Sequence, residues 1–128
     1  MIEYLGEVAP LTDSEKELLV KKISDYLIEN ELQYMTAIYY NNVRLIWDCN
    51  LNKYITTKDV KATDWLEFDD VCNQHICMSF EGDLYNVINC YTDTYNELDK
   101  FDMFIESLGL SYELGNAWNM VIYRKLKK

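Results

Sequence analysis

Proline and glycine are scarce in this sequence, with one proline and four glycines among 128 residues. Disordered chains and low-complexity linkers are rich in such residues and poor in hydrophobic ones. Here 49% of the residues are hydrophobic, and no repeat or linker interrupts the chain. We therefore expect a single domain over residues 1–128 with one buried core.

A long hydrophobic run and a basic N-terminal segment are also absent. A membrane-spanning helix needs about 18 or more apolar residues, and an export signal begins with a basic segment followed by an apolar one. The first seven residues, MIEYLGE, have neither feature. We expect a cytoplasmic protein that does not bind membranes, in which the four cysteines are free thiols.

Recognisable catalytic motifs are missing as well. His75 is the only histidine, and no serine or cysteine stands at the spacing of a nucleophilic triad. The four glycines are scattered, so the sequence contains no phosphate-binding loop. Adjacent acids such as Asp69 and Asp70 could bind a metal or transfer protons, but neighbouring surface carboxylates are usually only solvated. These absences favour a non-enzymatic protein without a cofactor.

One group of residues leaves an enzymatic alternative open. Thiolate and imidazole are the ligands that zinc prefers, and the weak candidates for such a site are Cys72, His75, Cys77 and Cys90. The paired CxxC spacing of common zinc sites is absent. Packed thiols beside a strand histidine are the simpler interpretation, and a zinc- or thiol-dependent enzyme is the alternative.

Capping patterns predict two main helices and one short helix. A serine or threonine followed three residues later by glutamate forms a capping box, and Thr12 with Glu15 and Thr94 with Glu97 have this pattern. Gly109 supplies a left-handed C-cap for the last helix. The spacing of apolar residues predicts helices over residues 12–30, 64–73 and 94–108.

Turn-forming pairs between strand-like segments predict three β-hairpins. The turns are expected at Asn41-Asn42, Gly82-Asp83 and Gly115-Asn116, within residues 34–49, 75–91 and 110–123, and a further short strand is expected over 53–57. Pairing about the first turn sets Ile38 opposite Leu45. Pairing about the second turn sets His75 opposite Cys90, which is the only positional support for a metal or thiol site.

Hairpin connections make neighbouring strands antiparallel, so these elements predict the α+β class. We expect an antiparallel sheet built from β-hairpins, with two main helices and one short helix packed on it, in a single two-layer domain. Residues 124–128 are rich in lysine and are expected to form a solvated basic C-terminal tail.

Basic residues are few, with 12 against 22 acidic residues and a net charge of -10 at pH 7. Proteins that bind nucleic acid by neutralising phosphates need a basic surface, so direct binding of DNA or RNA is disfavoured. Residues 62–123 hold 12 acids and one base, whereas the rest of the chain holds 10 acids and 11 bases. The whole excess of negative charge therefore lies in the second half.

Part of this excess forms a stripe on the last predicted helix. Asp99, Asp102 and Glu106 stand at positions i, i+3 and i+7, which stacks like charges on one exposed face. The axial steps between them are about 4.5 and 6 Å. These steps are similar in scale to one and two times the spacing of about 3.4 Å between successive phosphates of a nucleic-acid strand. Acidic helix faces also serve only to keep proteins soluble, and that interpretation stays open.

Tyrosine is abundant, with eleven residues, and it is enriched at protein interfaces because a large ring carries a polar tip. Aromatic residues are also natural strand formers that fill the core. The tyrosines expected to be at least partly exposed are Tyr39, Tyr40, Tyr85, Tyr91 and Tyr95.

The charge pattern predicts a small acidic binding or inhibitor protein that docks on the basic, nucleic-acid-binding surface of a partner protein such as a nuclease. Anti-CRISPR and anti-restriction proteins of phages and mobile elements, and immunity proteins that neutralise nucleases, act in this way, and the chain is similar to them in size and charge alone. The interpretation requires the carboxylates to form one continuous surface. The expected partner contacts are Asp99, Asp102, Glu106 and Tyr95, with a second patch of Asp64, Glu67, Asp69 and Asp70.

A structural or chaperone-like homodimer is another alternative, beside the zinc- or thiol-dependent enzyme. The order of predicted elements and the acidic pI are similar to those of small dimeric secretion chaperones, from which the final hairpin departs. Strand residues such as Ala37 and Ile46 make the first hairpin apolar on both faces. In a homodimer these residues would be buried between two copies.

Overall fold

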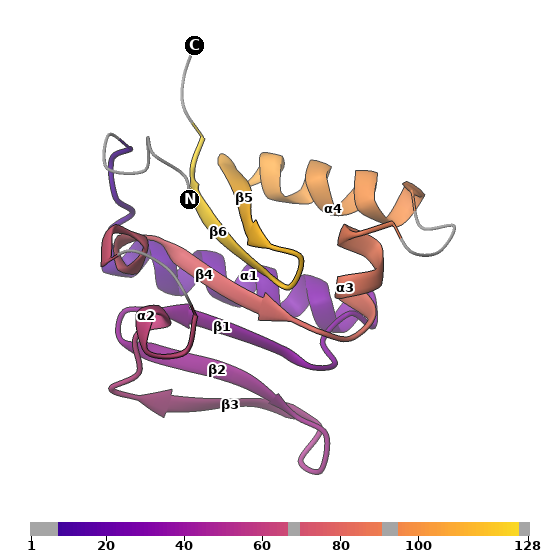
Figure 1. Cartoon of the computed structure of the whole chain (residues 1–128), viewed down its shortest axis with the longest axis horizontal. Helices are drawn as coiled ribbons and strands as arrows, with labels where there is room; N and C mark the ends of the chain where they lie inside the picture. The colour runs from indigo at the N-terminus through magenta and orange to yellow at the C-terminus, as the bar shows by residue number, and fades with distance from the viewer. Residues whose placement is uncertain (1–7, 67–69, 91–94, 126–128) are drawn as a thin grey trace.

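A computed structural model describes residues 8–66, 70–90 and 95–125. These residues form an antiparallel sheet of six strands in the order β3-β2-β1-β4-β6-β5 (Figure 1). The strands are β1 (Thr36–Tyr40), β2 (Val43–Asp48), β3 (Lys53–Lys58), β4 (Ile76–Phe80), β5 (Leu110–Asn116) and β6 (Asn119–Arg124). The helices are α1 (Asp13–Glu29), α2 (Ala62–Trp65), the 3-10 helix η2 (Asp70–Gln74), α3 (Asp83–Ile88) and α4 (Tyr95–Ser107). The α+β class predicted from the sequence is confirmed.

Helix α1 begins at the predicted capping box. The Thr12 hydroxyl accepts a hydrogen bond from the Glu15 backbone N–H at 3.1 Å, and the Glu15 carboxylate accepts one from the Thr12 backbone N–H at 2.9 Å. Two of the free N–H groups at the helix start are satisfied in this way. The first predicted helix is therefore confirmed.

The first hairpin has the predicted turn and register. Asn41 and Asn42 both have positive φ, 50° and 60°, as the central residues of a type I′ turn require. Ile38 pairs with Leu45, and the predicted third strand follows as β3. The short turn holds β1 and β2 in the register that the sequence indicates.

The second predicted hairpin is wrong, because the chain enters helix α3 directly after Gly82. Leu84, Val87 and Ile88 are all buried, and their i, i+3, i+4 spacing suits a helix rather than a strand. The actual neighbours of β4 are β1 and β6. His75 and Cys90 are consequently not a cross-strand pair.

The last hairpin exists, but its turn lies two residues later than predicted. Asn116 pairs with Asn119, so the turn is formed by Ala117 and Trp118. The Asn116 side chain accepts a hydrogen bond from Trp118 N–H at 2.9 Å, and the Asn119 side chain accepts one from Asn116 N–H at 3.0 Å. Two asparagine side chains fix this turn, and a register shift between residues 114 and 116 absorbs the offset.

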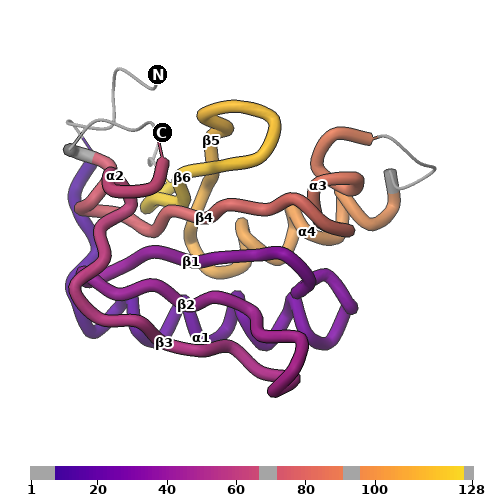
Figure 2. Tube along the Cα trace, turned by 60° about the horizontal axis from the view of Figure 1, so that its bottom comes forward, coloured from indigo at the N-terminus to yellow at the C-terminus, as the bar shows by residue number. Residues whose placement is uncertain are grey.

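The single short helix predicted over 64–73 is replaced by α2 and η2. Both lie on the face of the sheet opposite to the long helices (Figures 1 and 2). On this face Ala62 and Leu66 pack with Ala37, Tyr39 and other buried strand residues. Only part of this second face is covered, since Ile46 stays exposed there.

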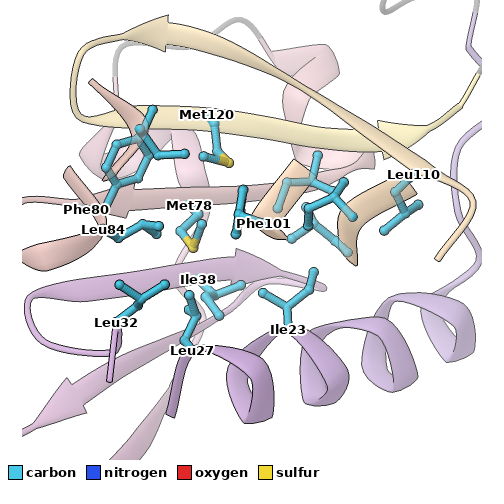
Figure 3. Close-up of a cluster of buried hydrophobic side chains, with 14 of the residues drawn as sticks. Ile23, Leu27, Leu32, Ile38, Met78, Phe80, Leu84, Phe101, Leu110 and Met120 are labelled. Atoms are coloured by element: carbon cyan, nitrogen blue, oxygen red, sulfur yellow. The ribbon is translucent and has the colours of Figure 1, made fainter. Parts of the chain in front are cut away.

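The main core lies between the sheet and helices α1, α3 and α4. Its largest fully buried side chains come from helices and strands alike and include Ile23, Leu27, Ile38, Met78, Phe80, Leu84, Phe101 and Met120 (Figure 3). Burial of such side chains is the dominant favourable contribution to folding. No helix in the described part of the chain has the length and apolar character needed to cross a membrane.

The expected solvated tail begins later than residue 124. Arg124 is the last residue of β6, and its guanidinium lies 3.0 Å from the Glu15 carboxylate of α1. Lys125 forms an ion pair with Glu106 of α4 at 2.6 Å. The prediction is therefore wrong for Arg124, which belongs to the sheet, whereas Lys125 follows the last strand and is exposed; residues 126–128 lie outside the described part of the chain.

Candidate functional site

The α4 carboxylates face away from the core. Phe101 and Ile105 are buried against the sheet, and the helical period therefore turns Asp99, Asp102 and Glu106 outward. All three acids are exposed. The helix thus presents the predicted acidic stripe on its solvent side.

A groove of about 510 Å³ lies between this stripe and the edge of the sheet. Strand β5 is the last strand in the sheet order and lies beside α4 (Figure 1). The groove is lined by Asp102, Ile105 and Glu106 of α4, by residues 110–114 of β5 and by Lys125. Two of the three stripe acids are therefore part of a concave site rather than of an isolated helix face.

Tyr112 of β5 fixes one wall of the groove. Its ring packs edge-on against Phe101 with centroids 5.5 Å apart, and its hydroxyl donates a hydrogen bond to Asp102 at 2.5 Å. Burial raises the pKa of Tyr112 well above its usual range, and the Asp102 carboxylate raises it further. Tyr112 therefore stays protonated, and its hydroxyl orients the Asp102 carboxylate.

Lys125 forms an ion pair inside the groove. Its ammonium lies 2.6 Å from a Glu106 oxygen, and this hydrogen bond together with the positive charge lowers the pKa of Glu106. Glu106 is therefore ionised at neutral pH. The groove already holds one lysine side chain, supplied by the protein itself.

Glu113 belongs to the same groove, although its place in the sequence did not indicate this. One of its carboxylate oxygens lies 3.3 Å from the Tyr123 hydroxyl, which donates to it. Asp102, Glu106 and Glu113 outnumber the single cation Lys125 among the groove residues. The only sequence signal for Glu113 is its membership of the acid-rich second half.

The outer edge of β5 offers backbone hydrogen-bonding groups to this groove. Lys125 N–H donates to Gly109 C=O at 3.0 Å, so residues 109 and 125 are a hydrogen-bonded pair of the β5–β6 ladder. Such pairs alternate along an antiparallel ladder, and the register then directs the peptide groups of residues 111 and 113 toward β6. The peptide groups of Leu110, Tyr112 and Leu114 point away from β6.

The expected continuous acidic surface is not formed by the described residues. Asp64 lies on α2, which packs on the face opposite to α4, and its carboxylate accepts a hydrogen bond from Lys61 N–H at 2.9 Å. Its structural role is to cap α2. The remaining predicted contacts lie outside the described residues or side chains, namely Glu67, Asp69, Asp70 and Tyr95.

The candidate metal ligands do not gather at one site. Cys72, His75 and Cys77 are fully buried, whereas Cys90 follows α3 and is partly exposed. The Cys77 thiol donates to the Cys72 carbonyl oxygen at 3.3 Å, and burial raises the pKa of Cys77 well above its usual range. Within the described ranges, no three His, Cys, Asp or Glu side chains lie close enough to hold a metal ion.

Among the tyrosines expected at the surface, Tyr39 is instead buried beneath α2 and η2. Its side chain lies on the face of the sheet that these short helices cover, and no spacing in the sequence predicts which face they cover. Tyr40 and Tyr85 are half-buried, as expected, and Tyr91 and the Tyr95 side chain are outside the described part.

A second concavity of about 400 Å³ lies on the partly covered face of the sheet. Trp65 is 61% exposed and Ile46 38% exposed, and the Arg44 guanidinium lies 5.0 Å above the Trp65 ring. Ala37 also lines this concavity but is itself buried within the domain. Of the two strand residues predicted to face a partner, only Ile46 is therefore accessible.

No protein-family model, no curated protein and no solved structure matches this chain.

Proposed function

We propose that the protein is a non-enzymatic acidic binding protein that docks on a basic surface of a partner protein. In the form that the charge pattern favours, it covers a nucleic-acid-binding surface, such as that of a nuclease, and so inhibits it. The observation that carries the proposal is the groove between α4 and β5, in which the exposed carboxylates of Asp102 and Glu106 line one side and Glu113 of β5 is a further lining residue. A reducing compartment such as the cytoplasm is part of the proposal and agrees with four cysteines that form no disulfide.

The groove has features that favour recognition of cations. Tyr112 holds the Asp102 carboxylate in place, and the lowered pKa of Glu106 keeps that carboxylate ionised, so both acceptors are in place before a partner arrives. Preorganised groups lose less conformational freedom on binding. Opposite charges on the two partners also speed association and make it sensitive to salt.

Neutral, shape-conserving substitutions test this proposal. The site variant combines Asp99→Asn, Asp102→Asn and Glu106→Gln, and the control combines Glu17→Gln, Asp25→Asn and Glu29→Gln on α1. Both sets remove three exposed acids, and each contains one acid paired with a lysine, Glu106 with Lys125 and Asp25 with Lys21. The two variants therefore differ in position but not in charge change.

Wild type and both variants are used for affinity purification from the native host, and each partner found is then purified and titrated. We expect a basic partner whose affinity falls by at least about tenfold in the site variant and by less than about twofold in the control. We also expect that affinity to fall with added salt. A neutral or acidic partner, or equal binding by both variants, would contradict the proposal.

A chaperone-like homodimer is a second candidate, favoured by the exposed aromatic concavity around Trp65 and Ile46. Exposed apolar patches of this kind mark interaction sites. Light scattering at increasing protein concentration tests it, with Ile46→Lys expected to convert a dimer into a monomer. A wild-type protein that stays monomeric throughout would exclude this candidate.

A further inference from the structure

The free edge of β5 is better suited to receive another strand than the opposite edge of the sheet. Natural proteins protect edge strands with lysine, proline or other obstacles. Strand β3, at the opposite edge, carries Lys53 and Lys58 at its ends, whereas β5 contains neither lysine nor proline. The irregularity of β5 lies at its end, between Leu114 and Asn116, and the peptide groups of Leu110, Tyr112 and Leu114 before it are directed away from β6.

A groove lies beside this edge, where an added strand would be placed. The groove of about 510 Å³ runs along residues 110–114 and is bounded on its far side by α4. A strand lies about 4.8 Å from its hydrogen-bonded neighbour. An extended segment in the groove would therefore lie between the edge of β5 and the outward side chains of α4.

The charges of the groove indicate what this segment carries. Side chains of a strand alternate between its two faces, so one set on the added strand would meet Asp102 and Glu106, and the other set would lie on the side of Glu113. Lys125 already places an ammonium group on Glu106. Exposed ion pairs of this kind contribute little to stability, so a cation from a partner can replace Lys125 at small cost.

We infer that the groove binds an extended, lysine- or arginine-rich segment of the partner, which adds to the sheet as a seventh strand along β5. This inference rests on the proposed function and specifies the form of the partner at the same site. Main-chain hydrogen bonds to β5 would give affinity, and the carboxylates would select a basic sequence.

The probe is a fluorescein-labelled heptapeptide of alternating lysine and valine, with both ends blocked. Fluorescence anisotropy measures its affinity, and a peptide of alternating glutamate and valine is the charge control. We expect the glutamate peptide to bind at least about tenfold more weakly. A third peptide, N-methylated on every backbone nitrogen, has no N–H group to donate from either edge and is expected to lose at least about fivefold in affinity.

Leu114 gives the matching test on the protein. Leu114→Ala removes an exposed side chain and keeps the outward N–H group, whereas Leu114→Pro removes that N–H group as well. Proline is tolerated in an edge strand at positions whose N–H group is not paired within the sheet. We expect Leu114→Pro to bind the lysine–valine peptide at least about fivefold more weakly than Leu114→Ala. Hydrogen exchange at the amides of Leu110, Tyr112 and Leu114 is expected to slow when the peptide binds wild type.

The outcomes separate this inference from the proposed function. If N-methylation and Leu114→Pro leave peptide affinity unchanged while the α4 site variant loses it, basic docking stands and strand addition is wrong. If the α4 site variant also binds normally, the proposed function is wrong as well. If Leu114→Pro fails to fold, as judged by circular dichroism, the N-methylated peptide and the hydrogen exchange decide the result.

Discussion

Two glycines are needed for different physical reasons. A Cβ atom at Gly82 would lie 2.5 Å from the Tyr34 carbonyl oxygen, so the start of α3 and the segment before β1 approach too closely for any side chain. Gly109 has no neighbour within 4 Å of such a Cβ, but its φ is +76°, a conformation that other L-residues adopt at a cost. One position is limited by space and the other by its backbone angle.

We expect Gly82→Ala to lower the free energy of unfolding by about 1 to 3 kcal/mol, since backbone must move to relieve the contact. Gly109→Ala is expected to cost about 1 to 2 kcal/mol from its left-handed backbone, and Gly109→Asn less, because asparagine tolerates this conformation. Urea unfolding measures all three. Equal stability of Gly82→Ala and wild type would show that the close approach to Tyr34 is not present.

The four cysteines should differ sharply in reactivity. Cys49 is exposed, whereas Cys72 and Cys77 are fully buried, and burial raises the pKa of the Cys77 thiol. Because the thiolate is the reactive form, we expect iodoacetamide to modify Cys49 in the native protein and to modify Cys72 and Cys77 only after unfolding. Mass spectrometry of timed samples gives the order. Rapid modification of Cys77 in the native protein would contradict this prediction and would favour the alternative of a thiol-dependent enzyme.

Tyr54 links stability to alkaline pH. Burial raises the pKa of Tyr54 to about 12. The hydrogen bond with the Thr36 hydroxyl, at 2.6 Å, lowers this pKa but has the smaller effect. A folded pKa above the unfolded one stabilises the protein below about pH 10, and this contribution is lost as pH rises through the folded value. We expect the free energy of unfolding to fall between about pH 10 and 12. The fall should be shallower in Tyr54→Phe, and an identical slope would contradict the assignment.

At the scale of elements, short sequence patterns correctly predicted the structures that depend on contacts between residues close together in the sequence. The capping box of α1 and the Asn41-Asn42 turn both act within a few residues, and both are present. The turn predicted at Gly82-Asp83 failed because Leu84, Val87 and Ile88 recur at helical spacing and are buried in α3, while β4 pairs with the distant strands β1 and β6. Composition around a glycine does not distinguish a hairpin turn from a helix start that needs a residue without a side chain.

The candidate site was predictable only in part. Helical period alone identifies the outward face of α4, and with it Asp99, Asp102 and Glu106. The groove also includes Glu113 of β5 and Lys125, which pairs with Glu106 of α4. Both are brought to the groove because the chain reverses at Gly109 and pairs β5 with β6. Such contacts follow from tertiary arrangement, and no spacing in the sequence encodes them.

Lys125 is expected to compete with a basic ligand for Glu106. In Lys125→Met the ion pair at 2.6 Å is lost while a long side chain is kept, so the alternating lysine–valine peptide should bind about two- to fivefold more tightly. Lys21→Met is the control, since it removes an exposed lysine paired with Asp25 on α1. Anisotropy titrations compare the two variants. Weaker binding by Lys125→Met would show that Lys125 supports the site rather than occupying it.

At the scale of the whole molecule, the two edges of the sheet differ in charge. The edge formed by β5 and α4 carries the groove carboxylates, and the other edge, β3, contains two lysines and no acid. Opposite charges at the two edges would orient the protein as it approaches a basic partner, with the groove in front. We therefore expect the acidic excess of the second half to orient the protein toward a basic partner, even though Asp64 lies on another face.

The central claim is that the α4–β5 groove is the site at which basic ligands bind. The most direct measurement is a titration of the ¹⁵N-labelled protein with the alternating lysine–valine peptide, followed by NMR at every backbone amide. The account predicts saturable shifts concentrated in residues 99–114 and at Lys125, which are absent when Asp102→Asn and Glu106→Gln are combined. Shifts centred on α1 or α2, or shifts that persist in this double variant, would contradict it.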